Sequence, residues 1–372
     1  MKYSKKSIGR AGDALVENND NMEALETLSF WRASHNHSLE NAFTLVEKLS
    51  KEVDKSVVLA KRLKRTESIV NKLDRFGNGG RGMKLHRMQD IAGCRVILSN
   101  IKKLQKFIKL LKENTVFEEK NNYITKPKDD GYRCVHFVGE FQNESGENRS
   151  IELQVRTRIQ HSWSTAVEIV DLFTNQSIKT SHGKVDWKEF FLHVGTQFEL
   201  LEKNTMIQTL TPQDLYNSYK SDFERYRNES LEQSIYYVHK QTQKLDILKK
   251  FTLFSASLNV ATEEIETQKG GYVLLVIDNI NKKEYSITTR SYGINEFEEA
   301  KESYLEEEKN SLNRSHYITA LVSTSSIGDI KDAYPNYFAD STQFVKYLGI
   351  ISHFYSKYFN VLEIASFWAK YR

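Results

Sequence analysis

The feature that most constrains this chain is the nine-residue stretch Asp-Ile-Ala-Gly-Cys-Arg-Val-Ile-Leu at positions 90–98. An acidic residue and an alanine–glycine pair lead into an apolar run that contains a single arginine, Arg95. An apolar run of this length predicts a buried central strand of a sheet. Because burying a charge without a partner is costly, Asp90 and Arg95 need partners from outside the strand. A metal ion and a polyphosphate would provide them.

The composition is that of a soluble protein with a packed core. The chain has 372 residues, 39% of them hydrophobic and 27% charged, which suggests two or three domains. A formal charge of +4 permits contact with nucleotides or RNA without requiring it. Cys94 and Cys134 both lie in apolar runs, which favours buried thiols over a disulfide or a zinc site. No apolar run is long enough to span a membrane, so we expect a cytoplasmic protein.

Basic helices are predicted before the central strand. Apolar residues at three- and four-residue steps predict a long helix from an N-cap at Ser38 toward Arg62. A second helix is expected over residues 67–76, with Ser68 and Lys72 on a polar, basic face and an apolar face formed by Ile69, Leu73 and Phe76. Such a cluster suits an anion with several charges, such as a triphosphate. The alternative is a solvated basic helix, which is the usual environment of a charge run. The glycines between 77 and 82 follow no strand and lack a P-loop ending, so they predict a flexible hairpin or lid.

The clearest alternation in the sequence predicts a strand over residues 148–157. Its apolar residues are Ile151, Leu153 and Val155, and its polar residues are Glu152, Gln154 and Arg156. If helices cover the apolar face, the polar face becomes the floor of a ligand cleft. Glu152 and Asp90 would then share a divalent cation through the oxygen ligands that Mg²⁺ prefers. The alternative is a solvated sheet face.

A turn between Pro127 and Gly131 precedes a further predicted strand. Tyr132, Cys134 and His136 share one of its faces by the period of two. A tyrosine beside a glycine at the start of a strand can present its ring to a flat ligand. The alternative is an ordinary half-buried tyrosine.

A separate C-terminal domain is predicted from about residue 268. Residues 164–260 are expected to be mostly helical, and the composition changes at 268–271. Strands are expected at 272–277, 283–289 and 317–324, a helix at 296–309, and a final helix or helix pair at 341–367. The sequence therefore predicts two domains, 1–267 and 268–372.

Taken together, these segments resemble the synthetase domain of the RelA/SpoT family. The matching pieces, in order, are Arg62-x-Lys64 with Ser68, Lys72 and Arg75; Asp90-Ile-Ala-Gly-x-Arg95; Tyr123 with Pro127-Lys128; Gly131-Tyr132 with His136; and Glu152-x-Gln154-x-Arg156-Thr157 with Trp163. The resemblance implies an α+β fold in which helices flank a mixed, nucleotidyltransferase-like sheet. It also implies transfer of the β,γ-pyrophosphate of ATP to a ribose hydroxyl.

The resemblance assigns a role to each matching residue. Arg62 and Arg95 would hold the adenine of ATP between their guanidinium planes. Lys64, Ser68 and Lys72 would complete the ATP site. Asp90 and Glu152 would be catalytic and would bind Mg²⁺, and Glu152 could instead act as the base. The residues expected to bind the acceptor are Tyr132, Lys128, His136, Gln154 and Arg156.

The C-terminal part resembles that of fused toxin–antitoxin alarmone synthetases of the CapRel type. That resemblance implies a small α+β domain, shaped like a zinc finger but without zinc, that inhibits the enzyme. Tyr355 and Tyr358 would occupy the ATP site in the inhibited state; the alternative is that both rings pack within their own domain. The resemblance further implies that the acceptor is the 3′ CCA end of tRNA and that a capsid-like phage protein releases the inhibition. Two other hypotheses are a (p)ppGpp synthetase that uses GDP or GTP, and a catalytically inactive nucleotide-binding module.

Overall fold

The computed structural model describes residues 3–64, 66–77, 82–174, 185–245, 247–248, 250–251, 271–281, 284–311, 318–323 and 337–359. The chain divides into two compact units. The sheet unit comprises residues 1–126 and 133–157, and the helical unit comprises residues 127–132 and 158–372. This division falls at residue 158, whereas the sequence predicted a domain boundary at 268. Several predicted segments, among them residues 78–81, 329–336 and 360–367, lie outside the described residues.

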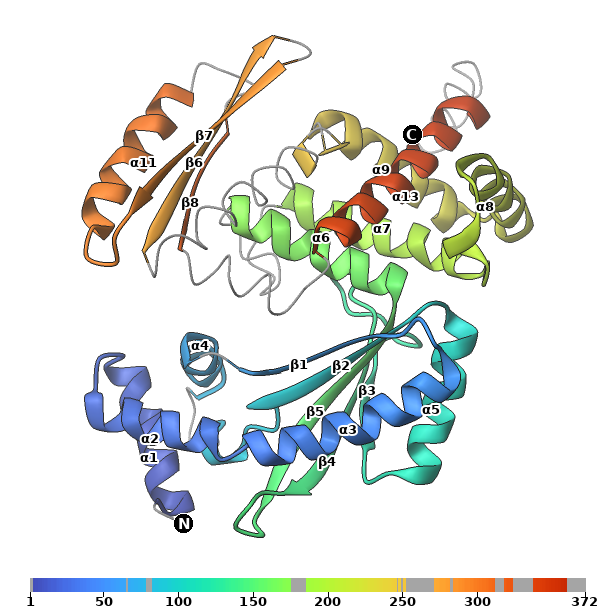
Figure 1. The fold of residues 1–372 in the computed structure, drawn as a ribbon. Helices are drawn as coiled ribbons and strands as arrows, with labels where there is room; N and C mark the ends of the chain where they lie inside the picture. Colours follow the sequence, from blue (N-terminus) through green and yellow to red (C-terminus); the bar gives the residue numbers. More distant parts are fainter. Residues whose placement is uncertain are drawn as a thin grey trace. The chain divides into compact units, whose positions relative to one another are not determined.

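The sheet unit is built on a five-stranded mixed sheet, as predicted (Figure 1). Its helices are α1 (Lys5–Glu17), α2 (Met22–Ala33), α3 (Asn36–Val53), α4 (Thr66–Gly77), the 3₁₀ turn η1 (Leu85–Arg87) and α5 (Ile101–Asn114). Its strands are β1 (Val58–Leu63), β2 (Ala92–Leu98), β3 (Glu118–Asn122), β4 (Val135–Gln142) and β5 (Asn148–Thr157). The strand order is β1-β2-β5-β4-β3, in which β2 and β5 are parallel and the other pairs antiparallel.

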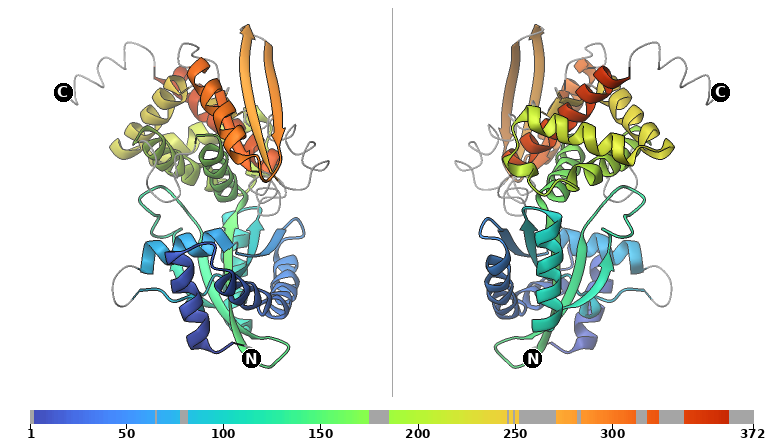
Figure 2. Two further views of the ribbon diagram at one scale, coloured as in Figure 1. Left: turned by 90° about the vertical axis from the view of Figure 1, so that its left-hand side faces the viewer. Right: turned by 90° about the vertical axis from the view of Figure 1, so that its right-hand side faces the viewer.

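Helices α3 and α5 cover one face of this sheet (Figures 1 and 2). The alternating apolar residues of β2 and β5 point toward them: Ala92, Cys94, Val96, Leu98, Ile151, Leu153 and Val155. Both cysteines are buried thiols, as predicted. A second apolar cluster joins α1, α2, α4 and η1 beside the sheet. The period-two pattern of the sequence thus decided which face of each strand is buried.

The predicted long helix ends earlier than expected. It runs over Asn36–Val53, and residues 58–63 form the edge strand β1 instead of a helical continuation to Arg62. Asp54 stops the helix, because its carboxylate accepts hydrogen bonds from the backbone N–H and the hydroxyl of Ser56. The predicted N-cap was also wrong. Ser38 lies inside the helix, and its hydroxyl donates to the carbonyl of Phe141 at 3.0 Å.

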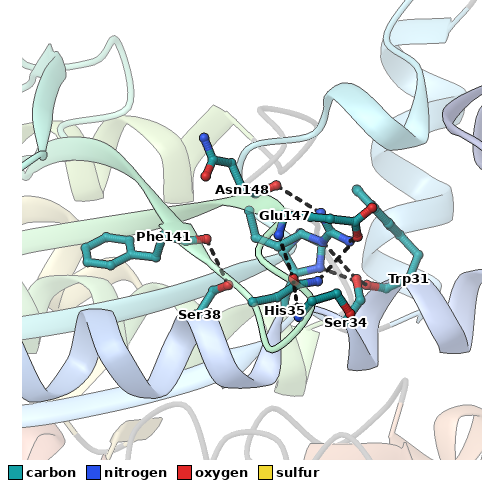
Figure 3. Close-up of polar contacts among 10 residues, drawn as sticks. Trp31, Ser34, His35, Ser38, Phe141, Glu147 and Asn148 are labelled. Atoms are coloured by element: carbon teal, nitrogen blue, oxygen red, sulfur yellow. Dashed lines mark hydrogen bonds and ion pairs between the residues drawn. The ribbon is translucent and has the colours of Figure 1, made fainter. Parts of the chain in front are cut away.

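A buried arginine fixes the β4–β5 hairpin against α2 and α3 (Figure 3). The Arg149 guanidinium donates to the Ser34 hydroxyl, the Asn148 carbonyl and the Glu147 carboxylate, and it lies over the Trp31 ring. Because each of its three nitrogens donates a hydrogen bond, the charge of this guanidinium is tolerated in the core. These contacts join the β4–β5 hairpin to α2.

The helical unit combines a helix bundle with a small sheet. Its elements are α6 (Arg158–Thr174), α7 (Val185–Glu202), η3 (Ile207–Thr209), α8 (Pro212–Tyr226), α9 (Glu229–Lys244), β6 (Tyr272–Asn281), β7 (Glu284–Tyr292), α11 (Phe297–Ser311), β8 (Ile318–Ser323) and α13 (Tyr337–Tyr358). The antiparallel sheet has the order β7-β6-β8 and packs against α11. Each of these three strands and α11 was predicted from the sequence.

The last described helix belongs to the bundle core of the helical unit. Phe344, Leu348, Ile351 and Phe354 of α13 are fully buried in the same apolar cluster as residues of α6, α7, α8 and α9. For this reason the predicted 268–372 segment does not pack as one body separate from the preceding helices. The zinc-finger-like shape expected for that segment stays a prediction. Among the described residues, no helix is both long and apolar enough to cross a bilayer.

Candidate active site

The face of the five-stranded sheet opposite α3 and α5 carries the predicted site residues of the strands. Arg62 on β1 is in register with Gly93 on β2, which in turn is in register with Glu152 on β5. A methyl group at Gly93 would lie 3.2 Å from the Glu152 carbonyl oxygen and 3.7 Å from its Cβ. The glycine therefore leaves space beside the Glu152 side chain, at the point where the sequence places its alanine–glycine pair.

The next position along the same face pairs an arginine with an amide. Arg95 is in register with Gln154, and its Nε lies 3.4 Å from the Gln154 Oε1. Arg62 and Arg95 lie two positions apart on this face, Arg62 exposed and Arg95 buried. Arg156 follows on β5, with only 1% of its surface exposed. The structure thus brings the two arginines expected at the adenine to one face of the sheet.

Asp90 sits at the entrance of β2 and is held by two lysines. The Lys64 Nζ lies 3.0 Å, and the Lys72 Nζ 2.7 Å, from the same oxygen, Oδ2. Burial by itself raises the pKa of Asp90, but the two ammonium charges outweigh it and keep the pKa below its usual range. The carboxylate is therefore ionised at neutral pH. Within the described part of the chain its other oxygen, Oδ1, is buried and accepts no hydrogen bond.

Glu152 is held by the neighbouring strand and by its own. The His136 Nδ1 lies 3.2 Å from its Oε1, and the Gln154 amide donates to its Oε2 at 3.0 Å. Burial and the nearby charge of Asp90 raise the pKa of Glu152, but His136 and the hydrogen bond from Gln154 together outweigh them and lower this pKa. Burial likewise lowers the pKa of His136, yet hydrogen bonds to Cys134 and Glu152 raise it to about 9. Asp90 and Glu152 are thus close enough to repel each other.

These two carboxylates fit a magnesium ion. An ionised Asp90 with one unpartnered, buried oxygen beside a second ionised carboxylate is an oxygen donor set of the kind that Mg²⁺ prefers. Mg²⁺ is commonly bound through one or two carboxylates, the remaining positions being filled by substrate phosphates and water. In keeping with this sparse donor set, no group of three or more His, Cys, Asp or Glu side chains in the described ranges could hold a metal ion.

The basic helix forms as predicted, with one difference. α4 spans Thr66–Gly77, and its buried face carries Ile69 and Leu73. Phe76, expected on that face, is 53% exposed, because the last turn of α4 extends past the cluster formed with α1 and η1. Ser68 is exposed on the helix, and Lys72 points to Asp90. The sequence did not reveal that both lysines expected in the ATP site, Lys64 and Lys72, reach this aspartate, because residues 58–63 were expected to be helical.

Two of the predicted acceptor residues belong to the helical unit. The Lys128 ammonium lies 4.9 Å from the centroid of the Tyr132 ring. That ring packs against Trp163 of α6, with 6.3 Å between their centroids. Tyr132 precedes β4 and is not part of that strand, which begins at Val135.

The two tyrosines expected to inhibit the enzyme also pack within the helical unit. Tyr355 is 6% exposed and stacks on His239 and Phe359 at 4.5 and 4.9 Å. Tyr358 lies 4.7 Å from the Phe354 ring and accepts a hydrogen bond from Arg227. Both rings therefore pack within their own unit in this structure, which is the alternative that the sequence left open.

Comparisons with known proteins agree with this geometry. A model of a region found in RelA and SpoT proteins matches residues 61–170, which run from β1 into α6. No curated protein matches the chain.

Several solved structures are similar to about half of the chain. Small alarmone synthetase 1 from Bacillus subtilis bound to its product pppGpp is 20% identical, with 48% of this chain and 94% of that chain covered and a TM-score of 0.41. The same synthetase bound to AMPCPP is 16% identical, with 50% and 96% covered and a TM-score of 0.37. A GTP pyrophosphokinase family protein from Streptococcus pneumoniae is 20% identical, with 47% and 89% covered and a TM-score of 0.38. Residues 61–170 of this chain thus form a region of the kind found in RelA and SpoT proteins.

Proposed function

We propose that this protein transfers the β,γ-pyrophosphate of ATP to a ribose hydroxyl, with Mg²⁺ held by Asp90 and Glu152. The observation that carries this proposal is the pairing of an ionised, half-satisfied Asp90 with Glu152 on the sheet face opposite α3 and α5. When bound, the metal ion would neutralise charge on the phosphates. Lys64 and Lys72 already lie beside this point and would turn to the triphosphate.

In the proposed reaction the acceptor hydroxyl oxygen forms a bond to the β-phosphorus of ATP. The bond between that phosphorus and the oxygen bridging to the α-phosphate breaks, and AMP leaves. In the alternative role left open for it, Glu152 accepts the hydroxyl proton instead of binding the metal ion, while His136 and Gln154 hold its carboxylate in place. Arg62 and Arg95 would hold the adenine. Positioning and charge neutralisation provide most of the catalysis in transfers of this kind.

We propose the 3′ CCA end of tRNA as the acceptor, with Tyr132 stacking on a base and Lys128, Gln154 and Arg156 lining the acceptor side. The support is the sequence resemblance of residues 268–372, with their Tyr355-x-x-Tyr358 pair, to the C-terminal part of fused toxin–antitoxin synthetases. Modification of the CCA end would stop aminoacylation and hence translation. The second candidate is (p)ppGpp synthesis from GDP or GTP, which the matched RelA/SpoT region favours equally.

The acceptor is tested with purified full-length protein, Mg²⁺ and γ-labelled ATP. Separate reactions contain bulk tRNA, tRNA lacking its terminal CCA, GDP, or GTP. Label on intact tRNA only supports the tRNA proposal, and label on GDP or GTP supports the second candidate. Nucleotide binding without AMP release in any reaction contradicts both and supports an inactive binding module.

Inhibition by Tyr355 and Tyr358 requires both rings to leave the helical core, with a capsid-like phage protein then restoring activity by binding residues 268–372. Truncation at residue 268 is a poor test, because it removes the core residues of α13. A better test is Tyr358→Ala, since this ring is only partly buried. The inhibition proposal expects higher basal transfer at an unchanged thermal unfolding temperature. Unchanged basal transfer in the folded variant contradicts it.

A further inference from the structure

The segment 127–132 lies between strands of the sheet unit in sequence but packs with the helical unit. Its backbone closes on itself: the Gly131 N–H donates to the Lys128 carbonyl, and the Lys128 N–H donates to the Tyr132 carbonyl. The Tyr132 N–H donates to the Asp130 carboxylate at 2.9 Å. We name residues 127–132 the acceptor loop, because they carry two residues expected to bind the acceptor. These bonds make the loop a compact turn whose placement depends on what it packs against.

The acceptor loop packs directly on the backbone of α7. A methyl group at Gly131 would lie 2.8 Å from the Phe191 carbonyl oxygen and 2.9 Å from the Leu192 Cα. Gly131 also has a φ of +89°, a conformation that favours glycine. From the other side, a methyl group at Gly195 would lie 2.9 Å from the Gly131 carbonyl oxygen and 3.3 Å from its Cα. Two glycines thus allow loop and helix backbones to touch.

The same contact is tied to α6. The Trp163 indole N–H donates to the Phe191 carbonyl oxygen at 2.9 Å. This is the same oxygen that a methyl group at Gly131 would contact. The Trp163 ring also packs against Tyr132. The loop is therefore fixed by α7 through its glycine and by α6 through its tyrosine.

We propose that Gly195, in the middle of α7, is a positioning residue that sets the place of Tyr132 and thereby the affinity for the acceptor. This proposal rests on the proposed function only for its effect on the acceptor. Gly195 lies outside the 61–170 match, so the proposal gives a helix that follows the matched region a part in acceptor binding. The loop placement itself is independent of which reaction the protein catalyses.

The test compares Gly195→Ala with Gly349→Ala in the full-length protein. Both glycines lie inside helices, so both substitutions should favour helix by about 1 kcal/mol. A methyl group at Gly349 meets nothing within 4 Å, whereas at Gly195 it meets the acceptor loop. We expect Gly195→Ala to raise the KM for the acceptor by roughly 10- to 100-fold, since small misplacements have effects of this size. The kcat at saturating acceptor and the Kd for ATP should stay within about twofold, and Gly349→Ala should change none of the three.

Amide hydrogen exchange provides a readout that does not depend on activity. Residues 128–133 should exchange faster in Gly195→Ala than in the wild type or in Gly349→Ala. Unchanged exchange with an unchanged acceptor KM overturns the proposal. Faster exchange with no transfer to tRNA, GDP or GTP, in the wild type as well, instead contradicts the proposed function and leaves the loop placement standing.

A second variant covers the case in which Gly195→Ala does not fold. Trp163→Phe keeps a ring against Tyr132 but removes the indole N–H that bonds Phe191. It should produce the same change in loop exchange and acceptor KM to a smaller extent. A loop that exchanges as slowly as in the wild type would contradict the proposal.

Discussion

Two aspartates of the sheet unit, the buried Asp54 and the half-buried Asp90, differ in how their charge is satisfied. Asp54, after α3, uses both oxygens: Oδ1 accepts from Ser56 and from Lys103 at 2.9 Å, and Oδ2 accepts from the Ser99 N–H at 2.8 Å. Asp90 receives two ammonium groups on one oxygen, and its buried Oδ1 accepts no bond from the described residues.

The comparison separates a structural carboxylate from one that is incomplete without a ligand. Burial raises the pKa of Asp54, but Lys103 and Ser99 more than offset it and hold the pKa well below its usual range. All of these hydrogen bonds to Asp54 come from residues at the junction of α3, β2 and α5. Asp90 instead keeps one buried oxygen, Oδ1, that a cation or a hydrogen-bond donor of a ligand can contact. Burying an acceptor without a partner costs free energy, and this cost is explained if the oxygen binds a ligand.

The largest expected effect is on activity at Asp90. Asp90→Asn should lower pyrophosphate transfer on the order of 10³-fold, because it removes one carboxylate of the proposed metal pair. Stability should change less than in Asp54→Asn, since Lys64 and Lys72 can turn their ammonium groups to water. Transfer is measured by AMP release and stability by urea unfolding. Near wild-type transfer would remove the distinction between the two aspartates.

The reverse pattern is expected at Asp54. Asp54→Asn should lower the free energy of unfolding by about 2–3 kcal/mol, because buried donors lose an ionised acceptor. At temperatures where the variant is folded, ATP affinity and transfer should match the wild type. A variant that is as stable as the wild type but inactive would show that Asp54 has a role in the site.

The lysines provide a matched pair of variants. Lys72→Met should weaken ATP binding by about 10-fold or more, the effect of losing a charge-assisted bond. It should also tighten Mn²⁺ or Mg²⁺ binding in the absence of nucleotide, because Asp90 loses a competing cation. Lys103→Met, which removes the cation beside Asp54, should change neither. Calorimetric titration measures both affinities, and weaker metal binding by Lys72→Met would contradict this reading of the site.

The smallest effect concerns pH. The pKa of His136 is raised to about 9 in the folded protein, above its ordinary value. Its pairing with Glu152 should therefore stabilise the fold fully below about pH 6.5, and this contribution should be lost as the pH rises through about 9. The difference in unfolding free energy between wild type and His136→Gln, about 1 kcal/mol at pH 6, should approach zero by about pH 10. A difference that grows with pH would mean that His136 is not the charged partner.

Much of the fold could be predicted from the sequence because its signals are local. Alternation over residues 148–157 predicts β5 with the correct buried face, and the apolar run after Asp90 predicts β2. The strands and helix after residue 271 were found in the same way. β1 was missed because Val57 continues the helical spacing of Leu49 and Val53, and only pairing with β2 makes residues 58–63 a strand.

The sequence by itself determined the inventory of the site: two acidic residues, the basic residues of residues 62–95, and the polar half of β5, recognisable by type and spacing. Only the tertiary structure decided how they are connected. It joined Lys64 and Lys72 to one oxygen of Asp90, placed His136 on Glu152, and packed the acceptor loop on Gly195. The physical reason is that periodicity records which side of an element is buried, whereas ion pairs and close backbone contacts depend on residues far apart in the chain meeting in space.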